Sequence, residues 1–115
     1  MEEKRPIRII DKDEGKEYVL EFTRETAAFT NKQGFVMTDF VNNIPEMLPI
    51  LFYGAFRKNH KNVSRAQTDN ILFNKLHGLT EAAATRLYEL YLAPSNELIN
   101  REEGDDPNAA ATVEL

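Results

Sequence analysis

Apolar and polar residues alternate near the start of the chain, which is typical of β-strands. The segments Ile7–Asp11 and Glu17–Phe22 are rich in β-branched and aromatic residues, and they flank Lys12–Lys16, which contains Asp and Gly. Two short strands around such a segment predict a β-hairpin over residues 7–22. Because a two-stranded hairpin is marginally stable by itself, we expect its apolar face to pack on helices.

After the hairpin, the apolar residues take up helical spacing. Thr23 is a suitable N-cap for a helix over residues 24–33, and Gly34 can end that helix in a left-handed conformation. A short helical turn is predicted over Phe40–Asn43, because Thr38 or Asp39 can cap it.

The most apolar helix is predicted to begin at Pro45 and to reach Phe56. A helix that is apolar around so much of its girth is usually central in its domain. Pro49 is expected to bend this helix or to reset its start. Gly54 permits the close approach of a neighbouring element. The apolar residues of this helix are Met47, Leu48, Ile50, Leu51, Phe52, Tyr53, Ala55 and Phe56.

Two later helices complete the predicted core. Ser64 and Gln67 form a capping-box pattern before a helix that Gly78 stops. Thr80 caps the next helix, which Pro94 is expected to end, and a last turn starting at Ser95 would hold Leu98 and Ile99.

The pattern therefore predicts a mostly α (α+β) fold. An N-terminal β-hairpin would pack on a bundle of about four to five short helices, all within one domain over residues 1–101. The last 14 residues carry five acids and no base, and residues 104–111 lack large apolar side chains. We expect residues 102–115 to form a disordered acidic tail, because they cannot bury enough apolar surface to offset their ordering entropy.

Charge and composition narrow the classes of function. The net charge of −5 comes from the tail, because residues 1–101 contain 14 acidic and 14 basic residues. A neutral body argues against nucleic-acid binding, which depends on contacts to phosphate. No apolar run is long enough to span a bilayer, and the N-terminus does not have the pattern of a secretory signal. We therefore expect no membrane partner and a cytosolic protein.

Candidate chemistry is sparse. The chain has no Cys, two His far apart in sequence, and five isolated Gly, so neither a metal-ligand pattern nor a phosphate loop is present. Ser64 and Ser95 are interpreted as helix caps rather than nucleophiles. The sequence predicts a binding protein rather than an enzyme, with no catalytic, cofactor-binding or metal-binding residues.

Aromatic residues are the best candidates for a binding surface. With 7 Phe and 4 Tyr, a small bundle has more rings than its core needs to cover. The rings of Phe52, Tyr53, Phe56, Tyr88 and Tyr91 are expected to be mostly core, and any that remain uncovered would line a groove for a partner helix.

The basic run Arg57–Lys61 follows the central helix. Its simplest interpretation is a solvated end whose cations complement the helix dipole. The alternative is a patch for an acidic partner or for nucleic acid. Arg57 and Lys58 complete the candidate partner-binding residues.

Several segments resemble a family of tail assembly chaperones from long-tailed bacteriophages. These segments are Lys16–Arg24 (KEYVLEFTR), Gln33–Phe35 (QGF), Leu51–His60 (LFYGAFRKNH), Leu87–Pro94 (LYELYLAP) and Asn96–Ile99 (NELI). The resemblance covers residues 16–99 and rests on packing motifs. Pro49 departs from it by interrupting the helix before the LFYGAF segment, and Arg57 departs from it by replacing an apolar residue.

The resemblance implies a function. Such a protein binds the long helical tape-measure protein in the host cytoplasm and keeps it soluble while the tail tube assembles. It is absent from the mature virion. Other tail proteins and a second copy of the chain, in a homo-oligomer, are further candidate partners. The alternatives are a structural tail or head-tail component of the virion, and a small nucleic-acid-binding regulator that uses Arg57, Lys58 and Lys61.

Overall fold

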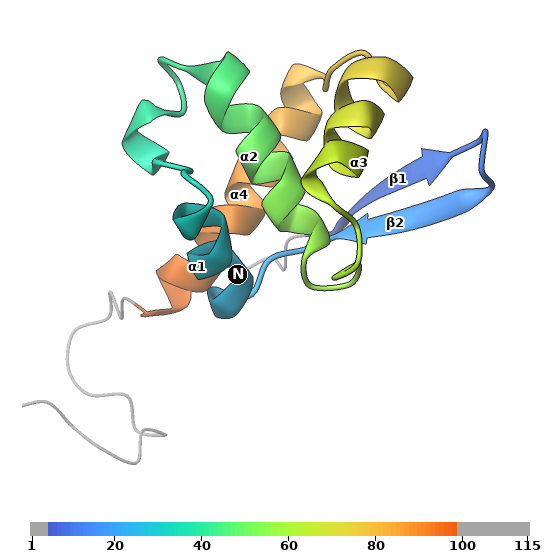
Figure 1. Ribbon diagram of the computed structural model, residues 1–115. Helices are drawn as coiled ribbons and strands as arrows, with labels where there is room; N and C mark the ends of the chain where they lie inside the picture. Colours follow the sequence, from blue (N-terminus) through green and yellow to red (C-terminus); the bar gives the residue numbers. More distant parts are fainter. Residues whose placement is uncertain (1–4, 99–115) are drawn as a thin grey trace, which may run out of the picture.

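The computed structural model describes residues 5–98 of the 115-residue chain, so the tail predicted over residues 102–115 lies outside the described part. A two-stranded hairpin is followed by helices, which confirms the predicted mostly α (α+β) fold (Figure 1). Among the helices of this part, none is both long enough and apolar enough to cross a bilayer. The elements are β1 (Ile7–Asp11), β2 (Lys16–Leu20), α1 (Arg24–Lys32), the 3₁₀ turn η1 (Met37–Asp39), α2 (Ile44–Phe56), α3 (Arg65–Asn70), the π-helical turn η2 (Ile71–Lys75) and α4 (Glu81–Leu98).

The hairpin has the predicted place and a defined register. Strands β1 and β2 are antiparallel, with Ile7 opposite Leu20 and Asp11 opposite Lys16. The turn between them is closed by the Asp11 carboxylate, which accepts hydrogen bonds from the backbone N–H groups of Asp13 and Glu14. The buried face of the hairpin, which includes Leu20, packs into the helical core.

Helix α1 begins and ends as the sequence indicates. The side chain of Thr23 accepts a hydrogen bond from the backbone N–H of Thr26, and the hydroxyl of Thr26 accepts one from the backbone N–H of Thr23. At the other end Gly34 has a φ of 107°, and the N–H of Phe35 reaches back to the carbonyl of Thr30. This is a Schellman ending, and it turns Phe35 into the core.

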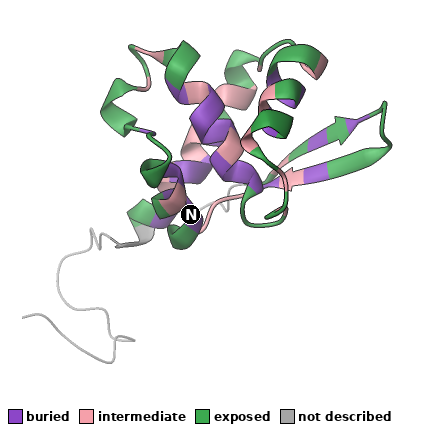
Figure 2. Cartoon of the chain, viewed as in Figure 1, coloured by how far each residue is buried: buried purple, intermediate pink, exposed green. Residues whose placement is uncertain are grey.

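Helix α2 is the central element, as predicted. Most of its residues from Met47 to Phe56 are buried, and it lies among the other helices in Figure 2. Pro49 is buried within the helix, which starts at Ile44 and continues to Phe56. Pro49 therefore does not reset the start of the helix, since only one backbone donor is lost and the ring is covered by the core.

Gly54 brings α1 and α2 together. A Cβ placed on Gly54 would lie 2.8 Å from the Cβ of Thr30 and closer still to its hydroxyl oxygen. Thr30 is fully buried, and its hydroxyl donates to the carbonyl of Thr26 over 2.8 Å. The missing side chain of Gly54 is thus what allows α1 to approach α2.

The structure corrects two of the predicted boundaries. The helical turn expected over Phe40–Asn43 is a 3₁₀ turn at Met37–Asp39 instead. Helix α4 was expected to end at Pro94, but it continues to Leu98 and so includes Ser95. Leu87, Leu90, Tyr91 and Pro94 lie on one buried face of this helix, and the burial of that face outweighs the one backbone bond that proline removes.

The third helical segment contains a feature that the sequence pattern did not predict. Ser64 and Gln67 form the expected capping box, but α3 passes into the π-helical turn η2 before Gly78 stops it. The N–H of Leu76 bonds to the carbonyl of Ile71 over 2.8 Å, which is the i to i+5 pairing of a π-helix.

Candidate partner-binding surfaces

The structure divides the seven candidate binding residues between the core and the surface. Phe52, Phe56 and Tyr91 are buried in the hydrophobic core, so their rings are not available at the surface of the monomer. The side chains of Tyr53 and Tyr88 are half-buried, and Arg57 and Lys58 are exposed. These four residues have different neighbours, because Tyr53 and Arg57 contact Phe29, Lys58 contacts Glu21, and Tyr88 contacts Phe40 and Tyr91.

Tyr53 and Arg57 meet a third residue on the surface between α1 and α2. The ring of Phe29 lies 5.6 Å from that of Tyr53, and the guanidinium of Arg57 lies 4.6 Å from the centre of the Phe29 ring. A guanidinium over an aromatic face is attracted by the ring quadrupole. Lys58 forms an ion pair with Glu21. Two cations of the basic run therefore have partners within the chain.

Four of the six exposed large apolar side chains among residues 5–98 lie between the end of α1 and the first residue of α2, where the sequence pattern predicted no site. Residues 36–44 carry four exposed large aliphatic side chains, and Val41 is the most exposed of them at 77%. This segment projects from the bundle on the side away from the hairpin (Figures 1 and 2). We call residues 36–44 the apolar segment; its four exposed residues are Val36, Met37, Val41 and Ile44.

The apolar segment has a fixed shape. The N–H of Val36 points at the sulfur of Met47 over 3.3 Å, and the N–H of Asn43 bonds to the carbonyl of Asp39 over 2.9 Å. The side-chain amide of Asn43 donates to Glu46 over 2.7 Å. These bonds hold the chain through the 3₁₀ turn, so its aliphatic side chains project from a defined backbone.

An aromatic base supports the segment from below. Phe40 stacks on Tyr88 with ring centres 4.9 Å apart, and it also contacts Phe35 at 5.8 Å. Phe35 in turn contacts Tyr91 at 4.9 Å. Tyr88 and Tyr91, two of the predicted binding residues, therefore support the surface rather than form it. One signal in the sequence pointed to the segment, since Val36, Met37, Val41 and Ile44 fit no helical stripe.

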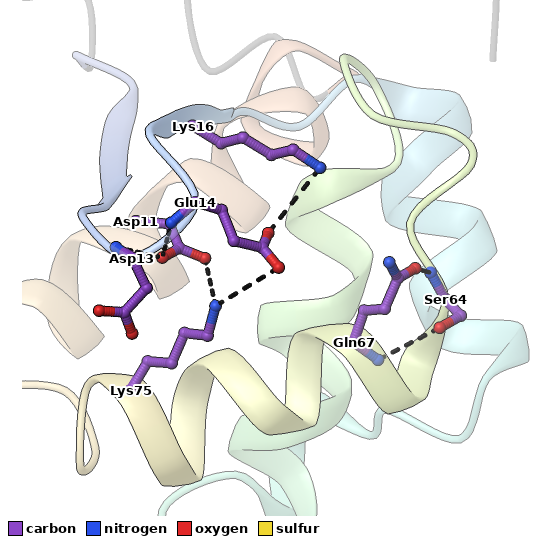
Figure 3. A network of polar contacts seen from close by, with 7 residues as sticks. All are labelled: Asp11, Asp13, Glu14, Lys16, Ser64, Gln67 and Lys75. Carbon is purple, nitrogen blue, oxygen red and sulfur yellow. Dashed lines mark hydrogen bonds and ion pairs between the residues drawn. The ribbon is translucent and has the colours of Figure 1, made fainter.

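A polar cluster joins the hairpin turn to η2, as Figure 3 shows. The ammonium of Lys75 lies 2.5 Å from a carboxylate oxygen of the buried Asp11 and 4.0 Å from Glu14. The hydrogen bond from Lys75 lowers the pKa of Asp11, with help from the backbone bonds of Glu14 and Asp13, while burial opposes this shift. The same hydrogen bond raises the pKa of Lys75.

This cluster is internally satisfied. Asp11 accepts bonds from Asp13, Glu14 and Lys75, which accounts for both of its oxygens. No group of three or more metal-ligating side chains occurs within residues 5–98. The arrangement ties the tip of the hairpin to the helices, and we assign it a structural role.

The side chains that could have suggested catalysis have structural partners. The Nε2 atom of His60 accepts the N–H of Val19 over 2.9 Å, and Ser64 caps α3. His60 follows α2, and its ring binds the backbone of strand β2. His77 is exposed at a left-handed position, with a φ of 56°.

A family model described as a domain of unknown function (DUF5055) matches residues 1–115 of the chain. No curated protein and no solved structure gives a significant match.

Proposed function

The chain belongs to the DUF5055 family, and we propose that it is a tail assembly chaperone of a long-tailed bacteriophage that covers the tape-measure protein before the tail tube forms. The apolar segment carries this proposal together with the family-like sequence segments. In this proposal the protein is a binding protein without an active site, and it acts in the host cytoplasm.

The exposure of the apolar segment supports a binding role. Burying Val36, Met37, Val41 and Ile44 in water-free contacts would be favourable, yet among residues 5–98 they remain between 45% and 77% exposed. Clustered apolar side chains on a defined surface mark sites of protein interaction. Their placement on a projecting, hydrogen-bonded backbone suits contact with the apolar stripe of a helix.

The charge around the segment indicates what kind of helix would fit. Asp39 and Glu46 are the only ionisable side chains among residues 35–46, and both are acidic and exposed. A partner helix with Lys or Arg beside its apolar stripe would place these cations near the two carboxylates. Such complementarity adds specificity and speeds association.

A small surface can still serve a long partner. Four aliphatic side chains offer one weak contact, far below the area of a standard stable interface. A tape-measure helix presents many similar stretches in series, so many copies of this chain can bind along it. If neighbouring copies also touch, their combined binding exceeds that of a single copy.

Co-expression with the tape-measure protein of the same phage tests the proposal. The wild-type chain should keep that protein soluble and co-purify with it, and Val41→Asp or Met37→Gln should abolish co-purification without changing the unfolding midpoint. Phe73→Gln is the matched control, because Phe73 is also exposed but lies on η2, outside the segment. The proposal fails if the wild-type chain does not bind, or if all three variants bind equally.

Mass spectrometry of purified phage particles separates the chaperone from a structural tail component. A chaperone is displaced on assembly, so its peptides should be missing from mature particles. Their presence in stoichiometric amounts would favour the structural component.

A further inference from the structure

The two edges of the hairpin are treated differently by the rest of the fold. The outer edge of β2 is covered by the end of α2 and the residues that follow it. His60 accepts the N–H of Val19 over 2.9 Å, and the side-chain amide of Asn59 donates to the carbonyl of Val19 over 3.0 Å. The N–H of Glu21 bonds to the carbonyl of Ala55 over 3.2 Å.

The register then fixes which groups lie on the other edge. Val19 is opposite Arg8, and its backbone groups point away from β1. In an antiparallel pair, the backbone N–H and C=O groups of both residues at such a position point away from the partner strand. The same holds at every second residue along each strand. The N–H and C=O groups of Arg8 and Ile10 therefore point away from β2, and within residues 5–98 they have no hydrogen-bond partner.

A hollow of about 320 Å³ runs beside this free edge. One wall is formed by residues 9–13 of β1 and the turn, and the other wall is formed by Ile71, Lys75 and Leu76 of η2 and its end. Ile10 lines the hollow and is 65% exposed. The edge thus has room beside it, and the lining of the hollow combines apolar side chains such as Ile71 and Leu76 with the ion-paired Asp11 and Lys75.

We propose that the free edge of β1 is a second binding site, which takes an extended segment of a partner protein as a third strand. Main-chain bonds to Arg8 and Ile10 would hold that segment, as in other cases of strand addition. Its side chains on one face would rest on Ile71 and Leu76 in the hollow. This site is separate from the apolar segment and does not depend on the function proposed for it.

The side chains of the edge select the chemistry of the partner strand. Ile10 stands two positions from Arg8 and two from Lys12, so an apolar residue lies between two cations. Arg8 also forms an ion pair with Glu17 at 3.2 Å, but both side chains are exposed and the pair is weak. Cross-strand pairs of opposite charge stabilise a sheet. The matching segment has an apolar residue with an acidic residue two positions before it and another two positions after it.

The two sites lie on opposite sides of the molecule. The hairpin extends from one side of the bundle and the apolar segment from the other (Figure 1). One copy can therefore hold a helix and a strand at the same time, which would link two components during assembly.

A capped peptide of sequence TEVIVET, titrated into the ¹⁵N-labelled full chain, tests the strand site by NMR. The amides of Arg8 and Ile10 should shift saturably and gain protection from hydrogen exchange. The charge-reversed peptide TKVIVKT is the matched control, and it should bind at least about tenfold more weakly, because two favourable cross-strand pairs become repulsive.

Two variants separate main-chain binding from side-chain contact. Ile10→Pro removes the outward N–H but no bond to β2, and proline is tolerated on edge strands. It should abolish binding, whereas Ile10→Thr keeps the N–H and should retain it.

Equal binding of the two peptides, or no shift with either, would overturn the proposal. Protection of the Arg8 and Ile10 amides without peptide would also overturn the proposal. If that protection rises with protein concentration, the edge binds a second copy of the chain. If that protection is lost when residues 102–115 are removed, the edge binds the chain's own C-terminal residues.

Discussion

Single residues join parts of this fold that lie far apart in sequence. Asp11 is a clear case, because one carboxylate closes the hairpin turn and pairs with Lys75, which is 64 positions away. Thr30 and Gly54 are a second case, since the absence of a side chain on one makes room for the other. At the residue scale, the charge and the size of one side chain decide whether such a contact forms. Conservative substitutions that change only the charge or only the size can test this.

Asp11→Asn should remove a pH-dependent part of the stability. The folded-state pKa of Asp11 lies below its ordinary value of 3.8, so its contribution is present above that value and is lost as the pH falls through the folded pKa. Asparagine keeps an oxygen for the turn but loses the ion pair. Urea unfolding from pH 7 to pH 2 should therefore show the gap between the wild type and the variant closing on the acid side.

Asp13→Asn is the control for that series. It makes the same change of charge at an exposed neighbour that accepts no bond from Lys75. Its curve should run parallel to that of the wild type. A gap for Asp11→Asn that stays constant down to pH 2 would show that the ion pair does not contribute to the stability.

Gly54→Ala should destabilise the protein although alanine favours helices. The new methyl would overlap Thr30, and overpacking of this kind costs about 1–3 kcal/mol beyond the helix propensity gained. Adding Thr30→Ala removes two of the overlapping atoms and should recover part of the loss, which a double-mutant cycle measures as a coupling free energy. A higher unfolding midpoint for Gly54→Ala would mean that α1 and α2 are not held this closely.

At the scale of helices and strands, the sequence patterns predicted most of the structure. The hairpin, the caps at Thr23 and Ser64, the central place of α2 and the close approach at Gly54 all follow from local rules of spacing and capping. The end of α4 did not follow, because the burial of Pro94 depends on helices that only the tertiary fold brings near it. The π-helical turn of η2 escaped prediction for a similar reason, since no residue type specifies it.

Two serines that look alike in sequence should therefore respond differently to alanine. Ser64 caps α3 and accepts the N–H of Gln67 over 3.2 Å, so Ser64→Ala should cost about 1 kcal/mol of unfolding free energy. Ser95 lies exposed inside α4, where alanine has the better helix propensity, so Ser95→Ala should be neutral or stabilising by up to about 0.5 kcal/mol. Denaturant unfolding of both variants decides this, and a loss at Ser95 equal to that at Ser64 would contradict the continuous helix.

At the scale of the whole molecule, the exposed apolar surface was harder to predict than the core. Aromatic residues at helical spacing, such as Phe52 and Phe56, look the same whether they fill a core or line a groove, and here the core takes them. The four exposed side chains of the apolar segment lie around a 3₁₀ turn, where the one sign in the sequence is that they fit no helical stripe. Surfaces of this kind depend on what the fold leaves uncovered, and that is known only once every element is placed.

The attachment of the hairpin to the helices gives the last prediction. His60 follows α2, its ring contacts Tyr18 at 5.1 Å, and its Nε2 atom accepts the N–H of Val19. His60→Phe keeps a ring but removes the acceptor, which leaves a partly buried N–H unpaired at a cost of about 1–3 kcal/mol. If hairpin and helices unfold as one unit, this loss should appear in full in the global unfolding free energy, and the Val19 amide should exchange faster. His77→Asn, at an exposed left-handed position that asparagine also adopts, should change neither measurement. Faster exchange at Val19 with an unchanged global free energy would mean instead that the hairpin opens by itself, so that the free edge of β1 would lie on a mobile arm rather than on a fixed part of the fold.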